Sequence, residues 1–170
     1  EIVDRLAMLQ QTEVGHPGVN QVAIEKDWWV TVTLKALFQT DCRDSLIFKG
    51  GTSLSKGFGI IERFSEDIDL AISHSFFGIE KTGKSQREKL RKMARAYIHE
   101  TLSVQLDARL KEMGVSGYSI ENVSQVQDKD GEWRPIDSDK DPTVILLHYS
   151  SILEDTINYI PPRVKIEISC

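Results

Sequence analysis

The order of hydrophobic and polar residues along the chain predicts a series of helices and strands. Residues 25–39 and 85–113 carry apolar side chains at helical spacing, so each predicts a helix with a buried side. Residues 45–49, 65–73, 118–127, 143–151 and 163–169 are apolar or alternating runs of strand length. An acidic segment, residues 128–142, separates two of these runs and predicts a solvated hairpin or loop. The pattern therefore predicts an α+β domain whose later strands pair antiparallel.

Two of the predicted strands have one apolar and one polar face. From residue 67 to 72 and from residue 163 to 169, the even-numbered residues are apolar and the odd-numbered ones are polar or small. Successive side chains of a strand point to opposite sides, so the odd positions share a face. That face carries Asp67 and Asp69 in the first strand and Lys165 and Glu167 in the second.

A glycine turn follows the strand at residues 45–49. Gly50 and Gly51 allow a ligand to approach the backbone closely, and Thr52 or Ser53 is placed to cap a helix that continues to about residue 59. The N-terminus of such a helix presents free N–H groups to a phosphate, and the two hydroxyls add donors. These residues predict a phosphate cradle.

A pair of carboxylates follows this cradle along the chain. Asp67 and Asp69 lie about 7 Å apart at Cα on one face of a strand, so their carboxylates can converge on a hard divalent cation such as Mg²⁺. Phosphoryl or nucleotidyl transfer needs this combination of phosphate donors and metal-binding carboxylates. Lys56, Arg63 and Lys165 are further candidates for nucleotide contacts, although surface cations of this kind are often only solvated.

Other nucleotide-binding patterns fit the chain less well. Lys49 precedes the glycines instead of following them, which is not the P-loop order, and residues 57–59 lack the third glycine of a dinucleotide fingerprint. The Asp-x-Asp pair also suits a glycosyltransferase that binds a metal-linked sugar nucleotide. The Gly-Gly-Thr-Ser turn ahead of the acidic strand favours a bare triphosphate.

Composition and charge set further limits. The chain has 170 residues, of which 40% are hydrophobic, and its net charge of −5 argues against nucleic-acid binding through overall charge. A local exception is the basic stripe Lys84, Arg87, Arg91 and Arg95, flanked by Lys81, Lys89 and Lys92. The stripe is either a solvated helix face or a grip for an RNA backbone.

The remaining composition indicates a cytoplasmic protein. Cys42 and Cys170 lie far apart without a metal-ligand pattern, as expected for reduced thiols, and the four histidines match no zinc-site spacing. No apolar run is long enough for a membrane span. The chain begins without Met or a signal pattern, so we expect a piece of a longer protein.

The motifs together resemble a known family. Gly-Gly-Thr-Ser-Leu at residues 50–54, with Arg-Phe-Ser-Glu-Asp-Ile-Asp-Leu at residues 63–70, resembles the AbiEii-type nucleotidyltransferase toxins of the DNA polymerase β-like nucleotidyltransferase superfamily. The resemblance is tight over residues 25–71, including Glu-Lys-Asp-Trp at residues 25–28, and residues 163–169 look like the family's later strand.

The resemblance implies a nucleotidyltransferase-like fold with a mixed, largely antiparallel β-sheet flanked by helices, in one domain over residues 1–170. It implies that Gly50, Gly51, Thr52 and Ser53 hold the triphosphate of an NTP, that Asp67 and Asp69 bind Mg²⁺, and that Glu167 is the third catalytic acid. Members of the family continue into a helical region with further conserved motifs, which this chain lacks.

The expected function is Mg²⁺-dependent transfer of a nucleoside monophosphate from an NTP to an acceptor hydroxyl, with tRNA as the first candidate acceptor. By resemblance, the chain is the toxin of a bacterial toxin–antitoxin or phage-defence (abortive infection) pair, with a cognate antitoxin protein as partner. The alternative is an inactive nucleotide- or partner-binding module of the same fold.

Overall fold

A computed structural model describes residues 21–49, 67–79, 83–153 and 161–170. The helical elements are α2 (Gln21–Leu37), η1 (Arg43–Ser45), η3 (His74–Phe77), α4 (Lys84–Tyr97), η4 (Ile98–Leu102) and α5 (Ser103–Glu112). The strands are β1 (Leu46–Lys49), β2 (Asp67–Ile72), β3 (Tyr118–Asn122), β4 (Gln125–Gln127), β5 (Trp133–Pro135), β6 (Thr143–Tyr149) and β7 (Arg163–Ser169). Each strand predicted from the sequence is thus present in the described ranges, with shorter bounds.

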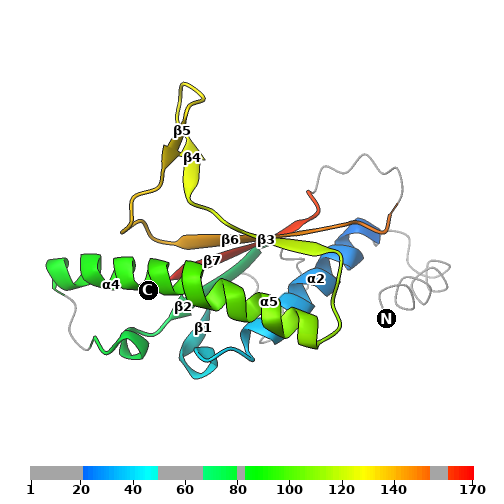
Figure 1. Cartoon of the computed structure of the whole chain (residues 1–170), viewed down its shortest axis with the longest axis horizontal. Helices are drawn as coiled ribbons and strands as arrows, with labels where there is room; N and C mark the ends of the chain where they lie inside the picture. The colour runs from blue at the N-terminus through cyan, green and yellow to red at the C-terminus, as the bar shows by residue number, and fades with distance from the viewer. Residues whose placement is uncertain (1–20, 50–66, 80–82, 154–160) are drawn as a thin grey trace.

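The main sheet has five strands in the order β1-β2-β7-β6-β3 (Figure 1). β2 and β7 are parallel, whereas β1 with β2, β7 with β6, and β6 with β3 are antiparallel. The sheet is therefore mixed and largely antiparallel, as the resemblance implies. β7, the last strand in sequence, occupies the centre of the sheet.

The helices cover one face of this sheet. α2 contacts β2 and β7, and α5 contacts β3. The apolar side chains of the central strands point toward them, and Ile68, Ile166 and Ile145 are fully buried as neighbours across β2, β7 and β6. The alternating pattern predicted this face correctly, because burial on one side of a strand needs a period of two.

The second long helix differs from the continuous helix predicted at residues 85–113. α4 and α5 are joined by a π turn, η4. Six buried residues follow one another at strict four-residue spacing: Leu90, Ala94, Ile98, Leu102, Leu106 and Leu110. Such a stripe drifts around a 3.6-residue helix by about 40° per step. The wider π turn takes up part of this drift and keeps the stripe against the sheet.

The acidic segment also differs from the prediction. Residues 118–127 form two strands instead of one, because the chain leaves β3 after Asn122, and β4 pairs with β5 in a separate two-stranded hairpin. The hairpin projects away from the sheet and helices (Figure 1), and all residues of β4 and β5 are exposed. Asp128 closes its turn by accepting hydrogen bonds from the backbone N–H groups of Asp130 and Glu132.

The start of α2 is tied to the far end of the sheet by a buried carboxylate. Glu25 is only 2% exposed and accepts hydrogen bonds from Ser151 Oγ at 2.7 Å and from the backbone N–H of Ile152 at 2.8 Å. Beside it, the buried Lys26 donates to the carbonyl of Pro161. These contacts explain two charged residues on an otherwise apolar helix, since buried charges need hydrogen-bonding partners.

Among the described residues, no helix is both long and apolar enough to cross a membrane.

Candidate functional site

The polar face of the sheet brings together residues from three strands. Asp69 on β2 has Glu167 on β7 as its register partner on one side and Lys49 on β1 on the other. Asp67 lies opposite Lys165. Paired positions on adjacent strands are about 5 Å apart, and paired side chains share a face. Two separate motifs of the sequence therefore meet on one surface.

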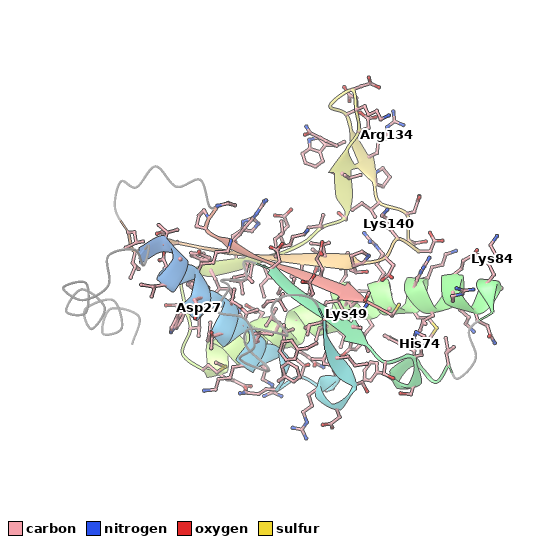
Figure 2. All side chains as sticks on the ribbon, turned by 180° about the vertical axis from the view of Figure 1, so that it is seen from behind. Asp27, Lys49, His74, Lys84, Arg134 and Lys140 are labelled. Carbon is pink, nitrogen blue, oxygen red and sulfur yellow. The ribbon has the colours of Figure 1, made fainter. Side chains whose placement is uncertain are left out.

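Two lysines make defined contacts on this face. Lys165 Nζ lies 2.5 Å from Glu167 Oε1, which is an ion pair between successive odd positions of β7. Lys49 Nζ donates a hydrogen bond of 2.6 Å to Ser169 Oγ and thereby links β1 to β7 across β2 (Figure 2). Lys49 is exposed, whereas both aspartates, Lys165 and Glu167 are half-buried. The surface thus carries accessible charges of both signs.

The electrostatics show a site with an excess of carboxylates. Burial raises the pKa of Asp69, and the neighbouring Glu167 and Asp67 raise it further, while Lys165 lowers it. The pKa of Lys165 is raised, mainly by its hydrogen bond to Glu167. Like charges at short range disfavour ionisation, so the fold holds Asp69 at an energetic cost that a bound cation would relieve.

This donor set fits a hard divalent ion in its chemistry. Asp67, Asp69 and Glu167 offer only carboxylate oxygens, the ligand type that Mg²⁺ prefers. In the part of the chain that the structure describes, however, no group of three or more His, Cys, Asp or Glu side chains is already arranged to hold a metal ion. Glu167 is instead turned to Lys165, so metal binding requires that this ion pair open.

Several predicted residues lie outside the described ranges. These are the glycine turn and the positions after it: Gly50, Gly51, Thr52, Ser53, Lys56 and Arg63. Lys49, the last residue of β1, is their nearest described neighbour in sequence. Their contribution to a nucleotide site therefore stays a prediction from the sequence.

The sequence interpretation missed two residues of this face. Lys49 was considered only for its position before the glycines, and Ser169 only as a polar position, yet their side chains are hydrogen-bonded beside Asp69. The signal for Lys49 was available, because it alternates with the half-buried Phe48 on a strand that leads into the turn.

The family comparison agrees with this geometry. A family model described as nucleotidyl transferase AbiEii toxin, type IV toxin–antitoxin system, matches residues 33–170. The chain belongs to this family. The matched range includes the polar face with both aspartates, Lys165 and Glu167. AbiEii proteins are nucleotidyl transferase toxins of type IV toxin–antitoxin systems. Neither the curated proteins nor the solved structures gave a match to this chain.

Proposed function

We propose that this AbiEii-family chain transfers a nucleoside monophosphate from an NTP to an acceptor hydroxyl, with Mg²⁺ as cofactor and tRNA as the acceptor class. The observation that supports this most is the convergence of Asp67, Asp69 and Glu167 on one face of two parallel strands. Nucleotidyl transfer is largely a matter of positioning and charge stabilisation, and clustered carboxylates beside cationic side chains provide the groups for both.

Each residue of the face has a role in this proposal. Asp67 and Asp69, together with Glu167, hold the divalent cation, which polarises the phosphate oxygens and stabilises the leaving pyrophosphate. Lys165 and Lys49 contact phosphate oxygens at the edge of the site. The glycine turn with Thr52 and Ser53 holds the triphosphate. In the reaction, the acceptor oxygen forms a bond to the α-phosphorus while the bond to pyrophosphate breaks.

The cellular role follows from the family. We propose a cytoplasmic toxin whose cognate antitoxin protein is its partner, in an abortive-infection or related toxin–antitoxin pair. Transfer of a nucleotide to the hydroxyl of a tRNA would block its normal use in translation.

The proposal is tested with labelled nucleotides. The protein is incubated with total tRNA, Mg²⁺ and each α-labelled NTP in turn, beside an Asp67→Asn variant with the same circular dichroism spectrum. We expect label on the RNA with one or two nucleotides and none with the variant. Equal labelling by both proteins would rule out the assignment of Asp67.

One observation favours a second function. Glu167 is paired with Lys165 at 2.5 Å, and this contact withdraws the third carboxylate from a metal. If the pair persists with nucleotide bound, the chain is a binding module without turnover. Calorimetry would then show NTP binding, while a coupled assay would detect no pyrophosphate with any acceptor.

A further inference from the structure

The long helical rod carries two very different charge patterns. α4 contains six cations and a single acidic residue, Glu88, although the chain as a whole has a net charge of −5. α5, the continuation of the same rod, balances its charges: Arg109 pairs with Glu112 and Lys111 with Asp107, both at 2.6 Å. Positive charge is therefore concentrated in the first half of the rod.

The cations of α4 are not neutralised within the protein. We use the name basic segment for Lys84, Arg87, Lys89, Arg91 and Lys92. None of the five has an ion pair or a side-chain hydrogen bond in the described structure, and Glu88 pairs with none of them. Four of them are exposed and Arg91 is half-buried. Arg95, which the sequence placed in the same stripe, is buried and donates to the carbonyl of Val123.

The basic segment projects past the sheet yet borders the candidate site. Lys84 marks the free end of α4 (Figure 2), and residues 83–89 are exposed without interruption. Toward its other end, Arg91 comes near Cys170, the residue that follows β7. Burial and Asp141 raise the pKa of the Cys170 thiol to about 11, whereas Arg91 and Lys49 both lower it. Arg91 and Lys49 therefore act on the same end of β7, next to the polar face.

We propose that the basic segment binds the phosphate backbone of a nucleic-acid acceptor and leads its reacting end toward the polar face of the sheet. The inference rests on the proposed function for the acceptor's role, but the binding itself does not require catalysis. Unpaired cations along one helix complement a row of phosphates without reading sequence. The net negative charge of the chain repels a polyanion elsewhere, so binding is directed to this surface.

Binding is measured first, in EDTA and without NTP, by fluorescence anisotropy of a labelled single-stranded RNA. We compare wild type with Arg87→Gln/Lys89→Gln/Lys92→Gln at several salt concentrations, roughly 50 to 200 mM. The triple variant should bind at least about tenfold more weakly, for RNA of any sequence, and its log–log salt slope should be smaller by about 2. An unchanged affinity and slope would overturn the proposal.

Two further variants control for damage to the fold. Arg109→Gln/Lys111→Gln removes two paired cations from α5 and should leave RNA affinity unchanged. Glu88→Gln removes the one anion of α4 and should tighten binding by about twofold to threefold, with a steeper salt slope. Loss of binding in the α5 variant, or no gain with Glu88→Gln, contradicts a local phosphate-binding surface.

The nature of the partner and the link to catalysis have separate readouts. A polyglutamate peptide of matched charge should not compete with RNA, and equal binding by it to wild type would overturn the nucleic-acid assignment. Asp67→Asn should bind RNA as wild type does. RNA binding that depends on the basic segment, without labelling by any NTP, refutes the proposed function alone. Labelling with an unchanged acceptor KM in the triple variant refutes the inference alone.

Discussion

Asp69 lies directly opposite Glu167 on the parallel strands β2 and β7, and each carboxylate makes the other harder to ionise. A purely structural sheet position would gain stability from a neutral or oppositely charged residue there. The pair is instead flanked by Lys49 and Lys165, whose contacts are to Ser169 and Glu167. This arrangement has consequences for stability and for pH dependence.

Replacing Asp69 by Asn should stabilise the fold at neutral pH while abolishing transfer. Burial, Glu167 and Asp67 raise the pKa of Asp69 in the folded state above its ordinary value of 3.8. Between the unfolded and folded pKa the native state binds more protons, so stability falls as pH rises through that window. The variant should gain roughly half a kcal/mol at pH 7 in urea unfolding, the size expected of a partly exposed charge.

This gain should disappear below about pH 4, where the carboxyl is protonated in both states. The exposed Asp44→Asn serves as the control and should show neither the gain nor its pH dependence. A loss of stability at pH 7 in the Asp69 variant would contradict the electrostatic account.

Replacing Lys165 by Gln should change both substrate binding and pH dependence. The ammonium lowers the pKa of Asp69, so its removal should move the acidic limb of kcat/KM to higher pH. If Lys165 also contacts phosphate, KM for the NTP should rise roughly tenfold, equivalent to about 1.4 kcal/mol. Steady-state kinetics across pH test both effects, with the exposed Lys35→Gln as the matched control. An unmoved acidic limb would exclude coupling between Lys165 and Asp69.

Replacing Glu25 by Ala should destabilise the protein by about 2 kcal/mol, because two hydrogen bonds to a buried carboxylate are lost. Glu25→Gln keeps an acceptor for the backbone N–H of Ile152, so it should lose less. Urea unfolding of the two variants checks the order. Equal losses would show that the negative charge itself is what the site requires.

The β4–β5 hairpin should be dispensable for folding. Its strands are exposed, and the backbone N–H of Ile136 already donates to the carbonyl of Ser124 at 2.8 Å, so a short Gly-Ser turn can close the gap. Replacing residues 125–135 should change the unfolding free energy by less than about 1 kcal/mol. Leu106→Ala, in the core, should cost about 3 kcal/mol in the same assay.

The sequence predicts faces well and partners poorly. The odd positions of β2 and β7 share a polar face as expected, because a one-residue shift would bury Asp69 and expose Leu70. The parallel pairing of β2 with β7 could not be predicted from the residues, since nearly a hundred residues separate them and period two is the same in either direction. The meeting of Asp69 with Glu167 came only from the resemblance.

Two local features were missed for different reasons. The hairpin had a usable signal in Asp130-Gly131, because Gly131 adopts a positive φ of 85° that a turn here requires. The short strands around it were hidden by acidic residues. The π turn had a subtler signal, the strict four-residue spacing from Leu90 to Leu110, which no uniform α-helix can bury.

The central place of β7 also dictates the order in which this protein can assemble. Before β7 is added, β1-β2 and β6-β3 are two separate sheet fragments, and no strand joins them. Pairings this distant in sequence form late, because closure of the long intervening chain has to precede them. During synthesis, both aspartates are made long before Glu167 and Lys165. A ribosome-bound chain that has not yet released β7 therefore lacks the polar face, and with it any harmful activity.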